Sequence, residues 1–475
     1  MIDSILDTLT SFKNVLWGPW TIIFIASVAV YFTLRTRFFQ AVRFPYILRQ
    51  TLGRLFDAEK TEDPHAMTPF QATSTALAGT VGMGNMAGVA TALSLGGPGA
   101  IFWMWVLAFL GMMTKTAEIT IAVHYREIDE DGQIHGGAMH YIQKGLGWTF
   151  LAYLFAAGML INSFFASSML QSHTVGRAFL SSYGTNPYLI TTLMALVTAT
   201  VVLGGVRRIG RFSEVMVPFM SVLYILAGLG LVIVNYERIP VVFQSIVQYA
   251  FSPAPAAGGA AGIAVAAAIR NGVSKGMLSN EAGLGTAPMV HATTNAAHPF
   301  QQGMWGALEV FVDTIVVCTI TAFAILSTGV LGAGVSGIEL VIDAFSAVFP
   351  PGTAQAIVSI SILTFSLSTQ IGFYIYYETS IDKLFGKTAI RYLKWFYFVP
   401  GIVFAGFANV DKLWVIADIA VGVVAIPNLI ALLFLGGVFV KLMKDYLSGE
   451  MLYGTAVVDA SKRYIKSPNR PGMKR

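Results

Sequence analysis

Eleven stretches of about 20 mostly apolar residues dominate this sequence, and each is long enough to cross the hydrocarbon core of a bilayer as a helix. Of the 475 residues, 55% are hydrophobic and only 12% are charged, about half the charged fraction of a soluble protein. These values exclude a disordered chain, a nucleic-acid-binding protein and an ordinary cytosolic enzyme. The sequence therefore predicts an all-α polytopic membrane protein with about eleven transmembrane helices. The stretches lie at 16–34, 70–95, 98–124, 148–178, 187–205, 212–234, 257–281, 304–328, 353–378, 391–408 and 412–440.

The basic residues divide unevenly between the two sides that these spans define. Of the 30 Lys and Arg residues, 23 fall on one side and four on the other, while three lie within spans. Cytoplasmic connections carry the excess of Lys and Arg in membrane proteins. With eleven spans, this rule predicts that the N-terminus is outside the cell and the C-terminus is in the cytoplasm.

The sequence predicts neither cysteine-based cross-links or metal clusters nor a cleaved signal peptide. The single cysteine, Cys318, excludes a disulfide framework and a cysteine-based metal cluster. The first apolar stretch is too long for the core of a secretory signal and lacks a basic start and a small-residue cleavage site. We therefore expect no cleaved signal peptide.

Two of the eleven stretches are poorly suited to continuous helices. The second stretch is rich in mid-span glycine, and each glycine costs a helix interior about 1 kcal/mol relative to alanine. The seventh stretch mixes glycine with Arg270 and Lys275 at membrane depth. Five spans separate the two starts, so the second segment is inverted relative to the first. Broken helices in corresponding places predict an inverted-repeat secondary transporter, with close helix packing as the alternative reason for the glycines. The glycines expected to break the helices are Gly79, Gly82, Gly84, Gly272, Gly276, Gly283 and Gly285.

The motifs at these segments are similar to those of a known family. Residues 79–90, 96–105 and 279–285 resemble the signatures of the alanine or glycine:cation symporters, which are sodium-coupled amino-acid carriers of bacteria and archaea. Further matches are the pair 136–137 and the segment 368–378. The resemblance extends from Trp17 to about residue 445. It implies a transporter rather than an enzyme, in the plasma membrane of a prokaryote, with no cofactor.

The resemblance also implies a leucine-transporter-like fold of five plus five helices with one extra N-terminal helix and two discontinuous helices. The expected units are an N-terminal helix with a basic cytoplasmic interfacial segment (1–69), a first five-helix repeat (70–235), an extracellular connection (236–256), a second, inverted repeat (257–440) and a basic cytoplasmic tail (441–475). The chain departs from the family pattern at Met83, at 138–140, at His173 and at Phe373. Most of these departures lie near the expected pocket, so they concern the identity of the substrate more than the mechanism.

A zwitterionic amino acid needs donors for its carboxylate, acceptors for its ammonium group and a pocket for its side chain. Groups freed in the first broken helix suit the carboxylate and the ion. Gln171 offers a polar side chain deep in the fourth stretch, although a hydrogen bond between helices is an equal alternative. Phe373 and Met277 suit an apolar wall or gate, with ordinary core packing as the alternative. The predicted substrate-binding residues are Thr80, Gly82, Met83, Gly84, Asn85, Gln171, Met277 and Phe373.

Sodium requires oxygen ligands, which carbonyl and hydroxyl groups supply. The ninth stretch carries Thr364, Ser368 and Thr369, and in related folds such a span meets carbonyls of the first broken helix, here near Gly79 and Gly82. The alternative is that these hydroxyls bond back to carbonyls of their own helix.

Ionisable residues within spans are functional candidates because their burial in lipid is costly. Lys115 and Glu118 are spaced to pair on one helix. Glu309 and Asp313 form a like-charge pair that needs a cation or a basic partner, for which Arg270 and Lys275 are natural candidates within a structural ion-pair network. Glu281 is expected at a cytoplasmic gate. The outer loop at 329–352, with Asp343, resembles a lid, and His173 is expected to be a satisfied helix histidine rather than a proton site.

The function predicted from these observations is symport of a small neutral amino acid, such as alanine or glycine, driven by the inward sodium gradient. A proton-coupled or glutamine-type carrier of the same fold is the alternative, and a channel is less favoured because no filter repeat is visible. The expected partners are the amino acid, Na⁺ (or H⁺) and the lipid bilayer. We expect no nucleic acid and no obligate protein partner.

Overall fold

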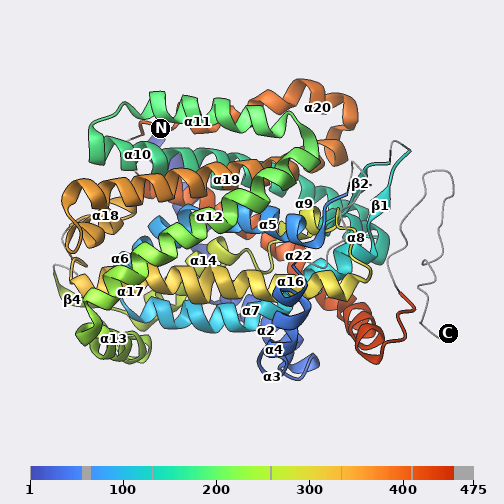
Figure 1. Ribbon diagram of the computed structural model, residues 1–475, viewed down its shortest axis with the longest axis horizontal. Coiled ribbons are helices and arrows are strands. Elements are labelled where there is room, and N and C mark those ends of the chain that lie inside the picture. Colours follow the sequence, from blue (N-terminus) through green and yellow to red (C-terminus); the bar gives the residue numbers. More distant parts are fainter. Residues whose placement is uncertain are drawn as a thin grey trace.

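The computed structural model describes residues 2–55, 66–130, 132–256, 259–332, 334–407 and 410–453. The fold is a bundle of long helices that run roughly along the long axis of the molecule (Figure 1). At one end of this axis lie α13, α18 and the strand β4, and at the other lie α8 and the hairpin β1–β2 (Figure 1). The two ends correspond to the sides that the sequence predicts to be extracellular and cytoplasmic.

The first half of the chain forms α1 (Ile2–Leu16), α2 (Pro19–Arg35), α3 (Phe39–Val42), α4 (Phe44–Gln50), a 3₁₀ turn (Leu52–Arg54), α5 (Pro69–Thr80), a π-helical turn (Gly84–Gly88), α6 (Val89–Gly96), α7 (Gly99–His124), α8 (Ala138–Leu146), α9 (Thr149–Asn162), a second π-helical segment (Ser163–Met169), α10 (Leu170–Tyr183), α11 (Pro187–Val202) and α12 (Gly205–Val234). Between α7 and α8 the strands β1 (Glu127–Ile128) and β2 (Ile134–His135) pair antiparallel.

The second half forms a 3₁₀ turn (Tyr236–Arg238), α13 (Ile239–Phe251), the antiparallel strands β3 (Ala254–Ala256) and β4 (Gly259–Ile263), α14 (Val265–Asn280), α15 (Ala287–His291), α16 (Pro299–Val310), a third π-helical segment (Phe311–Cys318), α17 (Thr319–Thr328), α18 (Ile338–Ser346), α19 (Pro351–Phe385), α20 (Lys387–Leu393), a 3₁₀ segment (Lys394–Phe398), α21 (Val399–Val403) and α22 (Val410–Ser448).

Within the described residues, seven continuous helices are long and apolar enough to cross a membrane, and a bent pair makes an eighth. Helices occupy all eleven stretches that the sequence marks as spans. The polytopic helical architecture is therefore confirmed, whereas the count of eleven crossings stays a prediction.

The first predicted break is present where the glycines indicated it. A capping box at Thr68 and Gln71 begins α5, which ends at Thr80. Val81 then takes an extended conformation, and the helix resumes at Gly84 with a bend of 48°. A bend this sharp separates two half-helices whose backbone groups near the break are free to bind other partners.

The second break lies after α14. Glu281, Gly283 and Gly285 all have positive φ, at 55°, 95° and 74°, so the helix cannot continue beyond Asn280. The expected break at Gly272 and Gly276 is wrong, because both lie inside α14. A Cβ atom on Gly272 would stand 2.3 Å from the carbonyl oxygen of Ala100 on α7, so close helix packing explains that glycine. The predicted span at 257–281 also starts late, at Val265, because β4 occupies its beginning; residues 257 and 258 lie outside the described residues.

The packing brings the two breaks together. α7 packs on both α14 and α16, while α5 packs on α12 and α19, and α14 contacts the π-helical turn that follows the first break. Each broken helix is thus supported by long continuous helices. Their unwound segments face each other in the middle of the bundle.

A tight corner connects α2 to α3. Arg37 and Phe38 are both in the left-handed region, with φ of 55° and 57°, which costs about 1–2 kcal/mol for each residue that is not glycine. The corner is held from inside, because Thr36 donates to the carbonyl of Phe32 and Gln40 donates to Thr33 at 3.0 Å.

Candidate substrate and ion site

A small cavity lies between the two breaks. Its volume is about 10 Å³, which is enough for roughly one water molecule. An amino acid can therefore enter only if the side chains around the cavity move. The lining residues come from both broken helices, from the end of α9 with the π-helical segment and α10 that follow it, from α19 and from α22: Gly79, Thr80, Met83, Gly84, Asn162, Ala166, Gln171, Leu278, Glu281, Leu284, Thr369, Phe373 and Val421.

Amide side chains hold the unwound backbone of the first break. The N–H of Met83 donates to Oε1 of Gln171 at 3.1 Å, and the N–H of Gly82 donates to Oδ1 of Asn85 at 2.9 Å. Gln171 therefore contacts the break through a hydrogen bond between helices, which is the alternative given for it, and its contact with a substrate stays a prediction. Asn85 does not line the cavity but lies behind it. These N–H groups stand at the start of a half-helix, where the helix dipole favours an anion.

Gly82 is packed between two polar side chains of the site. A Cβ atom at this position would lie 2.5 Å from Oγ1 of Thr369 and 2.8 Å from Nε2 of Gln171. Neither distance is tolerable, so both side chains would have to move.

We expect the substitution Gly82→Ala to reduce substrate uptake by about tenfold or more while the protein still folds, since it displaces a hydrogen bond of Gln171 rather than a core contact. Uptake by purified protein in proteoliposomes measures the effect. The matched control is Gly437→Ala on α22, where a Cβ atom would meet nothing within 4 Å. Equal uptake by the two variants would contradict the assignment.

A buried carboxylate connects the two breaks. Asp313 accepts hydrogen bonds from Nδ2 of Asn85 at 2.7 Å, from Ser279 at 2.8 Å and from Thr314 at 2.7 Å. All four side chains have 0% exposure. Among the ion pairs of the described residues, none involves Asp313. Its carboxylate, with the hydroxyl oxygens of Ser279 and Thr314 beside it, makes an oxygen-rich site of the kind that hard cations prefer.

The sequence assigned these residues to other roles. It placed Asn85 with the substrate and Asp313 in an ion-pair network, and it left out Ser279 and Thr314. The signal that could have indicated this cluster is Asp313 itself, an acidic residue at membrane depth with no basic residue close to it in the sequence.

The hydroxyl groups of α19 point in different directions. Thr369 donates to its own helix at Phe365 and lies 3.4 Å from the carbonyl oxygen of Val81 in the break. Ser368 instead contacts the sulfur of Met220 on α12 at 3.2 Å. Thr364 donates to carbonyls one turn back on α19, so its predicted role at the ion site is wrong. A step of five residues turns a helix about 140° past a full turn, which separates Thr364 from Thr369.

An ion-pair cluster lies beside the second break, with partners other than those expected. Nζ of Lys115 lies 3.2 Å from Glu309 and donates to the carbonyl of Asn280 at 2.8 Å. His291 contacts the other oxygen of Glu309 at 2.6 Å. The expected pair of Lys115 with Glu118 on one helix is wrong, because Glu118 accepts the N–H of Gly285 at 3.1 Å instead. The cluster therefore holds the end of α14.

The basic residues of α14 pair elsewhere. Lys275 forms an ion pair of 2.7 Å with Asp418 on α22, and its ammonium lies 4.1 Å from the ring centre of Trp414. Arg270 is exposed, and no ion pair in the described part of the chain includes it. The predicted pairing of these two residues with the acidic pair on α16 and its π-helical extension is wrong.

Glu281 and Met277, near the second break, do not lie where the sequence predicts them. Glu281 lines the central cavity instead of a cytoplasmic gate, because it is the first residue of the unwound segment, and its side chain accepts a hydrogen bond from Thr286 at 2.6 Å. Met277 is buried beneath Gly283, and Leu278 lines the cavity in its place.

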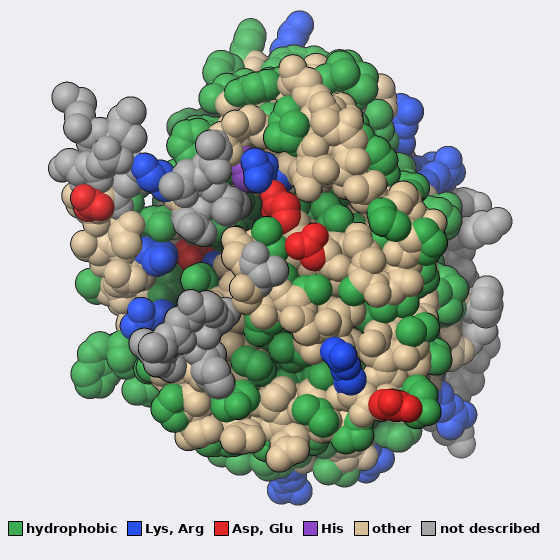
Figure 2. Space-filling view, turned by 90° about the vertical axis from the view of Figure 1, so that its left-hand side faces the viewer, with side chains coloured by type: hydrophobic (Ala, Val, Ile, Leu, Met, Phe, Trp, Pro, Cys, Tyr) green, Lys and Arg blue, Asp and Glu red, His purple; other side chains and the backbone are tan. Residues whose placement is uncertain are grey.

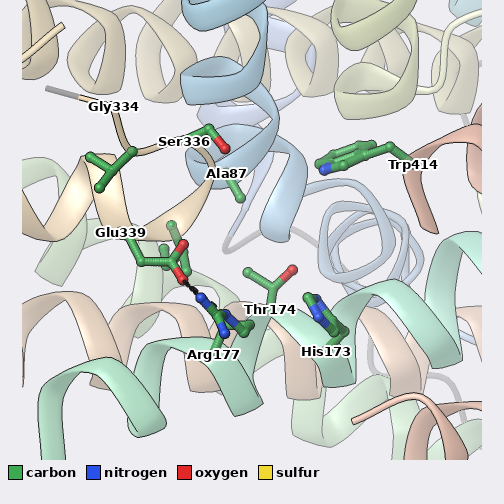
Figure 3. Close-up of a pocket in the computed structure, with 11 residues that line it drawn as sticks. Ala87, His173, Thr174, Arg177, Gly334, Ser336, Glu339 and Trp414 are labelled. Atoms are coloured by element: carbon green, nitrogen blue, oxygen red, sulfur yellow. Dashed lines mark hydrogen bonds and ion pairs between the residues drawn. The ribbon is translucent and has the colours of Figure 1, made fainter. Parts of the chain in front are cut away.

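A larger pocket of about 240 Å³ opens on the predicted outer side of the cavity (Figure 3). Thr174 lies one turn beyond Gln171 on α10, and Ala87 lies one turn beyond Gly84, so the pocket is adjacent to the centre. Arg177 and Glu339 form an ion pair of 2.8 Å that joins α10 to α18 across it (Figure 3). Charged side chains are few on this face of the molecule (Figure 2). The histidine expected to be satisfied is so at one ring nitrogen only: Nε2 of His173 lies 2.8 Å from the carbonyl oxygen of Phe407, whereas its buried Nδ1 has no hydrogen-bond partner among the described residues.

A pocket of about 320 Å³ lies on the predicted cytoplasmic side. Glu378 and Asp382 line it, about one and a half and two and a half turns beyond Phe373 on α19, together with His135 of β2. Asp129 joins the hairpin to α20, because it contacts His135 and Lys387, each at 2.7 Å. Partial burial would raise the pKa of Asp129, but the hydrogen bonds from Lys387 and His135 hold this pKa well below its usual range.

Two broken helices that meet at a small cavity, with a pocket on either side, define a secondary transporter of the inverted-repeat class. The comparisons with known proteins narrow this class. A model of the sodium:alanine symporter family matches residues 2–455. The chain belongs to this family.

Relatives with printed names include the sodium/alanine symporter AgcS of Methanococcus maripaludis, which is 38% identical over 93% of this chain and 97% of its own length. The probable sodium/glutamine symporter GlnT of Bacillus subtilis is 36% identical over 94% of this chain and 91% of its own. The crystal structure of MhsT in complex with L-phenylalanine aligns with a TM-score of 0.59 at 16% identity, over 82% of this chain and 96% of that one. It supports the leucine-transporter-like fold.

Proposed function

We propose that this protein couples the inward movement of Na⁺ to the uptake of a small neutral amino acid by alternating access. The observation that carries the proposal is the meeting of both broken helices at one cavity, with the buried carboxylate of Asp313 bonded to each of them. The outer and inner pockets then serve as the two routes to the cavity. The family and the names of its relatives support the substrate class.

The carboxylate of the amino acid binds at the N-terminal end of the second half of the first broken helix. There it replaces Gln171 as the acceptor for the N–H of Met83. The amide of Gln171 is then available to the substrate. Because Met83 and Phe373 line the cavity and leave little space between them, a small side chain such as that of alanine or glycine fits best.

The ion binds beside the substrate, at the oxygen-rich cluster around Asp313. Ser279 and Thr314 contribute hydroxyl oxygen atoms to it once their polar hydrogens turn away from the carboxylate, while the amide of Asn85 connects the carboxylate to the first break. A cation neutralises the buried charge there. Because the cluster includes residues of both breaks, ion binding draws the two unwound segments together, which links the ion to the substrate cavity.

Proton coupling is the second candidate. One relative from Bacillus subtilis, 34% identical, carries the printed name putative sodium/proton-dependent alanine carrier protein YrbD. A proton on Asp313 would neutralise the same buried carboxylate. Uptake that follows a pH gradient without Na⁺ would favour this candidate.

The test is uptake of labelled alanine, glycine and glutamine by proteoliposomes under a sodium gradient, a matched potassium gradient and a pH gradient. We expect accumulation under the sodium gradient alone, with competition strongest from small neutral amino acids. Uptake that is independent of every gradient, for all three amino acids, would exclude symport.

A further inference from the structure

A groove of about 680 Å³ lies far from the transport path, between the α2–α4 corner and the end of α22. Figure 1 shows α3 and α4 near the red end of α22, on the side predicted to be cytoplasmic. Four basic residues line the groove, and none of its lining residues is acidic. The basic residues are Arg35, Arg37, Arg43 and Lys444.

These four side chains are exposed. Within the described residues, none of them takes part in an ion pair. Asp445 is next to Lys444 but turns inward, where it lies 3.0 Å from His298 and accepts the N–H groups of Leu452 and Tyr453. Four uncompensated positive charges around one groove attract an anion.

Apolar side chains lie beside the basic ones on both sides of the groove. Val42 of α3 and Leu447 of α22 line it and are 70% and 44% exposed, and Met443 and Val440 line it along α22. An inorganic anion would gain nothing from these apolar side chains. A molecule with a negative headgroup and hydrocarbon chains would be matched by both kinds of side chain at once.

The groove is a fixed feature of the fold. Tyr446 on α22 donates to Gln50 on α4 at 3.1 Å, which ties the two sides together. The ring of Phe39 packs on Tyr46 and Phe300, and this holds the strained turn at Arg37 in place. A straight continuation of α2 would carry these basic residues away from Lys444. The strained turn at Arg37 therefore brings the basic residues together around the groove.

We propose that this groove binds the headgroup of an anionic phospholipid, with its phosphate held by Arg37, Arg43 and Lys444 and its acyl chains along Val42 and Leu447. Basic pockets between transmembrane helices on the cytoplasmic side bind lipid headgroups in this way. The bound lipid connects the α2–α4 corner to the end of α22. The site stabilises the protein without taking part in transport chemistry.

The test compares the wild type with a triple variant, Arg37→Gln, Arg43→Gln and Lys444→Gln. The control variant removes the same charge elsewhere on the predicted cytoplasmic side: Arg208→Gln, Arg211→Gln and Arg391→Gln. Native mass spectrometry then measures the retention of phosphatidylglycerol or phosphatidylcholine added to the detergent-purified proteins.

We expect the wild type and the control to retain phosphatidylglycerol at least fivefold more than phosphatidylcholine, and the triple variant to lose this preference. Thermal unfolding provides a second readout, because phosphatidylglycerol should raise the midpoint of the wild type but not of the triple variant. An equal loss in the control variant would overturn the site. Equal stabilisation of the wild type by inorganic phosphate or glycerol phosphate would overturn a lipid as the ligand.

Discussion

The substitution Asp313→Asn should weaken the apparent affinity for sodium by about 100-fold, which corresponds to about 2.7 kcal/mol. The amide keeps the shape of the side chain but removes the negative charge that faces the ion. Three neutral groups converge on this carboxylate, and no ion pair of the described residues includes it, so the ion supplies its counter-charge. The concentration of Na⁺ that gives half-maximal alanine uptake measures the effect.

A control variant and an assay of pH-driven uptake test the assignment of Asp313 to the ion site. Thr364→Ala removes a hydroxyl that the sequence assigned to the ion site but that bonds back to its own helix, so its sodium dependence should stay within about twofold of the wild type. A sodium dependence that is unchanged in Asp313→Asn would contradict the ion site. Loss of pH-driven uptake with sodium dependence intact would instead assign Asp313 to proton transfer.

The fold and the family could be predicted from the sequence because their signals are local. Glycines in mid-span, a long apolar stretch on either side and a motif of seven residues are all properties of continuous segments. The first break and the family were confirmed for this reason. Gly272 is the instructive exception. A glycine needed for the close approach of α7 looks the same in sequence as one needed for a break.

The partners of the buried charges could not be predicted, because they depend on contacts between helices distant in sequence. Lys115 was paired with a residue three positions away on its own helix, yet it pairs with Glu309, 194 positions away, and caps the end of α14. Asp313 was paired with a basic residue, yet its partners are neutral hydroxyl and amide groups. The rotation of α19 likewise decided which hydroxyl faces the break.

The substitution Lys115→Met should strongly destabilise the protein. Lys115 and Glu309 both have 0% side-chain exposure, and removal of one partner of a buried ion pair costs about 3–5 kcal/mol; Glu309 would keep only His291 as a partner. The end of α14 also loses the donor to the carbonyl of Asn280. The midpoint of thermal unfolding in detergent, followed by tryptophan fluorescence, measures the loss.

The control is Lys144→Met, which breaks an ion pair of 2.5 Å with Glu127 whose side chains are 53% and 42% exposed. Since exposed pairs contribute at most about 1 kcal/mol, the midpoint should fall at least threefold less than in Lys115→Met. The double variant Lys115→Met and Glu309→Gln removes both charges and should recover part of the lost stability. If it is no more stable than the single variant, an unpaired charge on Glu309 does not explain the lost stability, which is then due to the donor to Asn280 that both variants lack.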